Sequence, residues 1–150
     1  MNETYKLADL DDLEILLEMM KDYYKYDNLD FDKETATSSL SQLINNKLYG
    51  QIHLIIRDNM TIGYIALTLG FSLEFKGVDA FVDEIYIKEE FRGHGAGAKA
   101  LEFIDGICLS LGVKALHLEV ERKNIEAQGL YRKSGFVDHD RYLMTKWIKK

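Results

Sequence analysis

The spacing of apolar residues along the chain predicts two helices followed by a β-hairpin. Apolar side chains recur every three or four positions over residues 10–24 and 33–46, as on one face of a helix. β-branched and apolar runs then occupy residues 49–57 and 61–71. The Asp-Asn pair at 58–59 separates these runs and tolerates the left-handed conformations of a tight turn, so the two runs should pair as strands.

The second half of the chain alternates strands and helices around a glycine-rich turn. A strand is predicted over residues 80–87, and Arg92-Gly93-His94-Gly95-Ala96-Gly97 follows it. Apolar spacing then predicts a helix that ends at Gly112. We expect a short strand at residues 115–120, a short helix at 124–134 and a final strand region from 135 to 147. These elements predict a domain of mixed α/β structure. Because the strands of its first half are mostly antiparallel, the domain is of the α+β class.

Composition narrows the class of protein. With 150 residues, 47% of them hydrophobic, residues 1–150 should form a single domain. The net charge of −6 argues against a general binder of nucleic acid or anionic membranes, and no apolar run approaches the ~18 residues of a membrane span. Cys108 is the only cysteine, and the four histidines lack metal-ligand spacing. Because the N-terminus has no signal-peptide layout, we expect a cytoplasmic protein. We also expect no metal site, and we expect Cys108 to pack in the core.

The glycine turn is the first candidate for chemistry. A strand that stops at glycines and continues as a helix presents unpaired amides and the positive end of a helix dipole, which together bind anions. Arg92 adds a cation, and the small side chains of Ala96 and Ala98 leave room for a ligand. The spacing matches neither the Walker pattern nor the dinucleotide fingerprint. The alternative is that the glycines only turn the chain and cap a helix.

A second motif follows the next predicted strand. Its spacing is Asn124-x-x-Ala127-x-x-Leu130-Tyr131-x-x-x-Gly135-Phe136. With the glycine turn, it resembles the GNAT superfamily of N-acetyltransferases over residues 80–136, and the rest of the chain matches only in layout. The resemblance implies a mixed, mostly antiparallel sheet flanked by helices, in the order β-α-α-β-β-β-α-β-α-β-β. Glu89 stands where many relatives have proline, and either Glu90 or Arg92 aligns with the polar residue before the glycines.

The resemblance implies acetyl-CoA as cosubstrate, with its pyrophosphate at the glycine turn. The residues that it assigns to acetyl-CoA are Ile85, Tyr86, Ile87, Arg92, Gly93, His94, Gly95, Ala96, Gly97, Ala98, Asn124 and Tyr131. Asn124 would lie near the pantetheine arm, and it is also expected to cap its own helix.

In such enzymes an amine attacks the thioester directly, so a group must take the proton of the ammonium. Asp83 and Glu84 resemble the acidic pair of the polyamine and diamine acetyltransferase branch, and we favour Glu84, with Asp83 close behind. Only one of the two should face the acyl group unless a bulge intervenes, because successive strand residues point to opposite faces. The other carboxylate would then be a solvated strand residue. His117 and Glu119 are outside candidates.

Tyrosines are the second group of candidates. Tyr131 lies where the family places its general acid, and a phenol of pKa about 10 can protonate a thiolate of pKa about 8.5 in a closed pocket. Packing of its ring on the core is the alternative. Tyr23, Tyr24 and Tyr26 are expected mainly to pack, with lining of the acceptor cleft as the second possibility.

Charge is unevenly distributed along the chain. Residues 1–90 hold 18 acidic and 8 basic side chains, whereas residues 91–150 hold 7 acidic and 11 basic ones. A basic half suits an anionic cofactor, and an acidic half favours a cationic small-molecule acceptor such as a polyamine, a diamine or a lysine-like amine. Solvated helix faces also account for part of the asymmetry. The competing functions are a non-catalytic acyl-CoA-binding module and a nucleotide-binding domain.

Assembly is left open by the last residues of the chain. The segment from Asp140 to Lys150 could pack internally or across a two-fold interface, and relatives often form dimers, so a homodimer is a possible state.

Overall fold

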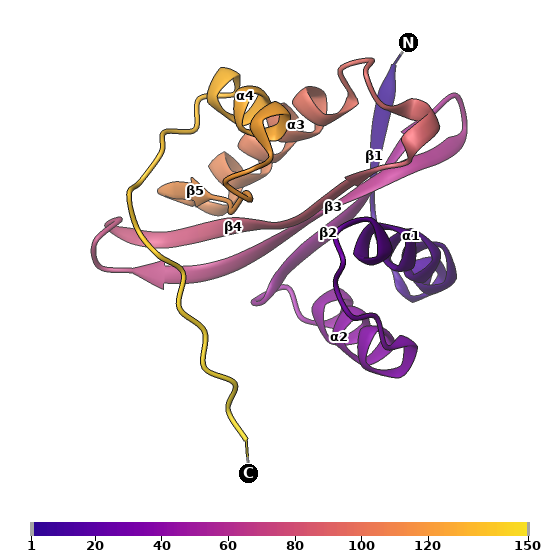
Figure 1. Ribbon diagram of the computed structural model, residues 1–150. Coiled ribbons are helices and arrows are strands. Elements are labelled where there is room, and N and C mark those ends of the chain that lie inside the picture. Colours follow the sequence, from indigo (N-terminus) through magenta and orange to yellow (C-terminus); the bar gives the residue numbers. More distant parts are fainter. Residues whose placement is uncertain (1, 150) are drawn as a thin grey trace.

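The computed structural model describes residues 2–149 and places one five-stranded sheet between two layers of helices (Figure 1). The strands lie across the sheet in chain order, with antiparallel neighbours throughout except for the last strand, which runs parallel to the fourth. They are β1 (Glu3–Leu7), β2 (Gly50–Arg57), β3 (Met60–Ser72), β4 (Gly77–Ile87) and β5 (Ala115–His117). The predicted α+β class with a mostly antiparallel sheet is confirmed.

The helices divide between the two faces of the sheet. Helices α1 (Leu13–Tyr26) and α2 (Lys33–Asn45) pack on one face, whereas α3 (Ala96–Leu111) and α4 (Ile125–Lys133) cover the other (Figure 1). Short 3-10 turns at Leu10–Asp12 and Glu89–Phe91 precede α1 and α3. None of the helices in residues 2–149 combines the length and the apolarity needed to cross a bilayer.

Alternation along the strands creates a separate core on each face of the sheet. On β3, Tyr64 and Ala66 pack toward α1 and α2, whereas Ile65 and Leu67 pack toward α3. This period of two is what a strand covered on both faces produces. Cys108 is 7% exposed and belongs to the α3 core, as expected.

Several predicted turns and helix ends are confirmed. Asp58 and Asn59 have φ angles of 50° and 65°, which are the left-handed conformations that a tight β2–β3 turn requires. Gly112 ends α3 with a φ of 72°. Asn124 caps α4, because its side chain accepts a hydrogen bond from the backbone N–H of Ala127 at 3.1 Å.

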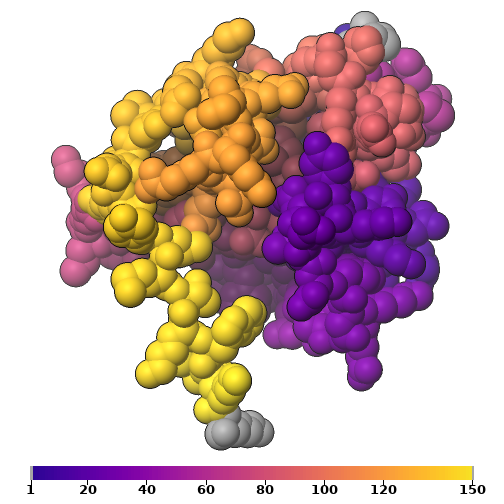
Figure 2. All heavy atoms as spheres, viewed as in Figure 1, coloured from indigo at the N-terminus to yellow at the C-terminus, as the bar shows by residue number. Residues whose placement is uncertain are grey.

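The end of the chain does not form the predicted strands. β5 stops at His117 rather than at residue 120, and within the described residues no strand follows α4, so the closing β-β of the expected order is absent. A strand needs a neighbouring backbone, and residues 136–149 have none in the part of the chain that the structure describes: they pass the β3–β4 turn, where Arg141 pairs with Glu74, and then extend beyond the sheet, as the yellow segment of Figures 1 and 2 shows. Six large apolar side chains there are 74–89% exposed, namely Val137, Tyr142, Leu143, Met144, Trp147 and Ile148.

Candidate active site

The site begins where β4 and β5 part. The two strands pair only from Asp79 to Phe81 of β4, and β4 then continues alone on this side to Ile87. Its backbone groups beyond Phe81 therefore have a strand partner on the β3 side only. Figure 2 shows the surface hollowed between the orange α4 region and the indigo α1 region. An extended ligand can pair with such an open edge through backbone hydrogen bonds.

The open edge leads directly into the glycine turn. Gly93 and Gly95 have left-handed φ angles of 84° and 81°, and a Cβ at either position would meet nothing within 4 Å. α3 then begins at Ala96 with no side-chain cap and no acidic residue in its first turn. Its first amides and the positive end of its dipole are thus available to a phosphate.

Gly97 has a different task from the other two glycines. A Cβ on Gly97 would lie 3.3 Å from Cδ2 of Leu130 on α4. The missing side chain therefore allows α3 and α4 to approach each other beside the open edge. Leu130 precedes Tyr131, so this contact also helps to position Tyr131.

Arg92 folds back onto the end of β4. Its Nε donates to the carbonyl oxygen of Ile87 at 2.7 Å, and its guanidinium lies 5.1 Å and 5.5 Å from the ring centres of Tyr26 and Tyr86. Both rings lie within cation–π range. His94 and Ala98 are exposed beside this cation, on and next to the turn.

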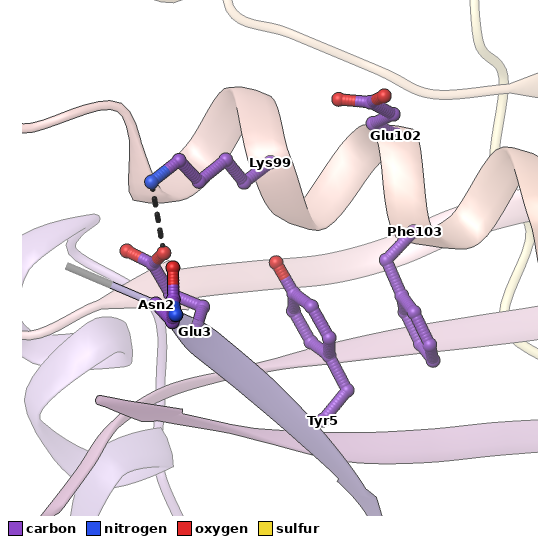
Figure 3. A pocket seen from close by; sticks show the side chains of 6 residues that line it. All are labelled: Asn2, Glu3, Tyr5, Lys99, Glu102 and Phe103. Carbon is purple, nitrogen blue, oxygen red and sulfur yellow. Dashed lines mark hydrogen bonds and ion pairs between the residues drawn. The ribbon is translucent and has the colours of Figure 1, made fainter. Parts of the chain in front are cut away.

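A buried ion-pair network supports the first turn of α3 (Figure 3). Lys99 donates to Glu3 on β1 at 3.0 Å, and Glu3 also pairs with Arg57 on β2. Burial alone would raise the pKa of Glu3, but the two cations together hold it below its usual value. Beside the network, an open hollow of about 550 Å³ is lined by Tyr5 and Phe103, whose rings stack at 4.2 Å. These rings belong to the α3 face, opposite the carboxylates described next.

A β-bulge brings both candidate carboxylates to the α1 face. Glu84 lies opposite Ala66 and Val82 opposite Leu67, so Asp83 is the extra residue of β4. Val82 and Ile85 on either side of the pair pack toward α3. Successive strand residues normally point to opposite faces, but the bulge makes Asp83 and Glu84 share one face.

Glu84 is held at both of its oxygens. Tyr24 of α1 donates to Oε2 at 2.5 Å, and Tyr64 of β3 donates to Oε1 at 2.7 Å. Burial raises the pKa of Glu84, the Asp83 charge adds to the rise, and the two phenols oppose it. Burial also raises the pKa of both tyrosines, so they remain protonated donors.

Asp83 differs from its neighbour in having an exposed side chain that makes no hydrogen bond within the described part of the chain. Desolvation by the surrounding protein nevertheless raises its pKa. Tyr23 joins the same cluster: its pKa is raised by burial and then by the charges of Glu84, Asp27, Tyr131 and Asp83. Tyr131 is half-buried, which raises its pKa, as does the charge of Asp27 at the end of α1.

Comparison with known proteins identifies this arrangement. Residues 13–136 match the sequence profile of the Acetyltransferase (GNAT) family. The chain belongs to the GNAT family. A solved integron cassette protein from the mobile metagenome of Cole Harbour Salt Marsh is 31% identical, with a TM-score of 0.86 over 97% of this chain and 91% of that one. A predicted acetyltransferase of Clostridium acetobutylicum, solved with acetyl-CoA, shares the fold at 17% identity, with a TM-score of 0.81 over 97% and 96% of the two chains.

Two curated relatives are similar over part of their length. Thialysine N-epsilon-acetyltransferase of Bos taurus is 32% identical over 77 residues, which are 51% of this chain and 45% of that protein. The putative [ribosomal protein bS18]-alanine N-acetyltransferase of Bacillus subtilis (strain 168) is 31% identical over 101 residues, 67% of this chain and 62% of that protein. The chain thus spans less than two thirds of either relative.

The GNAT chain brings most of its predicted site residues together and separates two of the minor candidates. His117 contacts Asp79 at 3.2 Å and packs against Phe75 and Phe81, toward the other end of β4. Glu119 is exposed in the chain after β5. Among residues 2–149, no three His, Cys, Asp or Glu side chains form a cluster that could hold a metal.

Sequence reasoning missed the two phenols that hold Glu84. Helical spacing predicts mainly packing for Tyr24, and the sequence pattern places Tyr64 only within the apolar strand run of residues 61–71. One signal was available: a tyrosine inside a buried strand needs a partner for its hydroxyl, and Tyr64 is 1% exposed.

Proposed function

We propose that this protein transfers the acetyl group of acetyl-CoA to the nitrogen of a primary amine. One observation carries the proposal: the open edge of β4 joins an uncapped helix N-terminus at one end and a pair of carboxylates at the other. An anionic cofactor and a cationic acceptor would thereby meet on a single strand. The fit is supported by Gly93 and Gly95, which leave open the space that side chains would fill.

Acetyl-CoA would be held by backbone and small residues. The edge of β4 at Ile85, Tyr86 and Ile87 offers backbone hydrogen bonds to the pantetheine arm. The turn from Gly93 to Ala98, with Arg92 and His94 beside it, suits the pyrophosphate. Asn124 and Tyr131, from the start and the C-terminal half of α4, would border the bound cofactor. When bound, acetyl-CoA supplies an activated acetyl thioester.

The carboxylates would handle the proton of the acceptor. An aliphatic amine with a pKa near 10.4 is mostly protonated at neutral pH, so it needs a site that attracts the cation and accepts its proton. Asp83 and Glu84 provide two negative charges on one face. Desolvation raises the pKa of each above its ordinary value, which makes each a stronger base than a solvated carboxylate.

Tyr131 would protonate the departing thiolate. Its raised pKa keeps the phenol protonated until the leaving group needs the proton. Burial and then the charges of Glu84, Tyr131 and Asp83 all raise the pKa of Tyr23. This shared influence on Tyr23 supports a common site for the proposed acid and the proposed proton acceptors.

The acceptor that suits this site is a small cationic amine such as a polyamine, a diamine or a lysine-like amine. The adjacent Asp83 and Glu84 charges support this choice, as does the acidic first half of the chain. The name of the Bos taurus relative also points to a lysine-like acceptor, whereas that of the B. subtilis relative points to an alanine. Alanine N-termini are therefore the second candidate class.

An acetylation assay with a panel of amines tests the proposal. Purified protein should release CoA from acetyl-CoA with at least one of spermidine, putrescine, a lysine analogue or an alanyl peptide, and the acetylated amine should appear in the mass spectrum. Thermal stabilisation by acetyl-CoA with no turnover on any amine would favour an acyl-CoA-binding module instead. Stabilisation by ATP or NAD but not by CoA would favour a nucleotide-binding domain.

The proposal also covers the oligomeric state of the protein and its cellular compartment. We infer that residues 137–149 pack against a second copy of the chain, because six large apolar side chains there would otherwise remain in water, and because β5 has no strand on its outer edge within the described residues. A cytoplasmic location rests on the single, buried Cys108, since disulfides mark oxidising compartments.

A further inference from the structure

The two carboxylates of the bulge have opposite hydrogen-bonding states. Both oxygens of Glu84 accept phenolic hydrogens, one from α1 and one from β3. Asp83, the next residue, has no such donor among the described residues and is exposed. Adjacent residues of the same charge thus have different surroundings, and that difference suggests different roles.

Two phenolic hydrogen bonds support the charged form of Glu84, and Asp83 has no such donor among the described residues. Hydrogen bonds to the ionised form stabilise it, and here they oppose the rise in pKa that burial causes. A proton arriving at either oxygen would have to weaken a bond of 2.5 Å or 2.7 Å. Each oxygen still has a lone pair for an ammonium N–H, so Glu84 can bind a cation without being protonated.

We propose that Tyr24 and Tyr64 are positioning residues that keep Glu84 as a fixed anion for the acceptor ammonium, and that Asp83 takes the proton. This inference rests on the proposed function and reverses the preference for Glu84 that the sequence suggested. Asp83 suits its role because no donor stabilises its charge and desolvation raises its pKa.

The proton balance of the step is simple. The ammonium bound to Glu84 gives one proton to the carboxylate of Asp83, and the neutral amine nitrogen then forms the new N–C bond as the C–S bond breaks. The thiolate receives a proton from Tyr131, and the second proton of the nitrogen passes through solvent to the Tyr131 phenolate, which restores the phenol. Asp83, which is exposed, releases its proton to solvent.

Of the two tyrosines that donate to Glu84, Tyr24 of α1 is the better one to substitute. Glu84 is faced by Tyr23 and Tyr24 from α1, by Tyr64 from β3 and by Asp83 from its own strand. Tyr64 is 1% exposed and fixed in the core, whereas Tyr24 is half-buried near the end of α1. Tyr24→Phe therefore removes one bond to Glu84 with less risk to folding than Tyr64→Phe.

The test compares four single variants in steady-state acetylation of the best amine of the panel. Asp83→Asn should lower kcat about 100-fold with KM for the amine nearly unchanged. Glu84→Gln should raise that KM at least about tenfold with a smaller effect on kcat. Tyr24→Phe should raise KM several-fold and shift the acidic rise in KM to higher pH, because Glu84 loses a bond that lowers its pKa. Tyr49→Phe, which removes a hydroxyl from a tyrosine that is 54% exposed, is the control.

Specific results would overturn this division of roles. The roles are reversed if Glu84→Gln loses kcat at unchanged KM while Asp83→Asn keeps its kcat. Tyr24 has no positioning role if KM and its pH profile match those of Tyr49→Phe. Wild-type protein that acetylates no amine refutes the proposed function itself, so the two failures are distinguishable. Thermal unfolding of each variant separates a loss of fold from a change in the site.

Discussion

Arg57 donates from Nε to Oε1 of Glu3 across 3.0 Å, and the two side chains are 4% and 1% exposed. Removing one member of such a pair leaves the other charge buried without compensation. Glu3→Gln should therefore lower the free energy of unfolding by about 3–5 kcal/mol, as measured by urea denaturation. Glu74→Gln, which breaks the exposed pair with Arg141, is the matched control and should unfold close to wild type. Equal stability of the two variants would contradict the role assigned to Glu3.

The same pair predicts how stability depends on pH. The pKa of Glu3 is lowered from 4.5 by the two cations, so its contribution is fully present above pH 4.5 and is lost as the pH falls through the folded-state value. Wild-type protein should lose stability on acidification over this range, and Glu3→Gln should lose less. Chemical denaturation at a series of pH values measures the difference, and parallel curves would count against the prediction.

Activity should respond to acid at a higher pH than ordinary carboxylates would give. Desolvation by the surrounding protein raises the pKa of both Asp83 and Glu84, and the proposed mechanism needs their charged forms, so kcat/KM should fall as the pH drops through the apparent values of the pair. A pH profile of kcat/KM, corrected for the protonated fraction of the amine at each pH, measures this fall. A rate that stays level down to about pH 4 would mean that neither carboxylate is needed in its charged form.

Tyr131→Phe should remove the proposed acid while leaving the ring in place. The ring lies 6.1 Å from that of Phe136, a contact that phenylalanine can keep, so stability should change little. We expect kcat to fall about 100-fold and the affinity for acetyl-CoA to remain within about twofold. Turnover and calorimetric titration with CoA measure the two quantities. An unaltered kcat would exclude Tyr131 from the mechanism.

Gly95→Ala tests the glycine turn. Alanine at a φ of 81° costs about 1–2 kcal/mol of stability, and its methyl group would fill space left open above the first turn of α3. CoA should bind at least about tenfold more weakly in calorimetric titration. Gly106→Ala is the control on the same helix, because it meets nothing within 4 Å and should stabilise α3 by up to about 1 kcal/mol. Equal CoA affinity in both variants would show that the turn is not the phosphate site.

The C-terminal segment predicts the state of assembly. Light scattering during gel filtration should give the mass of a dimer for the wild-type chain. Leu143→Lys combined with Trp147→Lys should give a monomer, because charges then replace two apolar side chains that are 74% and 82% exposed. Tyr49→Phe lies outside this segment and should remain dimeric. A wild-type chain that runs as a monomer at tens of micromolar would refute the proposed packing.

Much of the fold could be predicted because it depends on residues that are close in the chain. The β2–β3 turn needs left-handed residues at 58 and 59, and Asp and Asn tolerate that conformation. Gly112 and Asn124 mark helix ends for similar local reasons. The glycine turn could be located in the same way, since Gly93 and Gly95 adopt φ values that other residues avoid.

The failures concern partners that are distant in the chain. The apolar residues after Phe136 indicate a surface that must be covered, but their pattern does not say which backbone pairs with them, and within the described residues none does. Likewise, the sequence shows Asp83 and Glu84 only as two adjacent carboxylates. Whether they share a face depends on a bulge opposite Ala66 and Leu67 of another strand.

Local sequence thus determined the glycine turn, the helices and the hairpin, because backbone conformation and amphipathic periodicity are properties of neighbouring residues. Tertiary structure alone decided the state of Glu84, whose two donors come from positions 60 and 20 residues away in the chain. Their convergence depends on strand register and on which face of α1 packs against the sheet. Those are properties of the whole fold, and in the proposed mechanism they would decide which carboxylate binds the cation and which takes its proton.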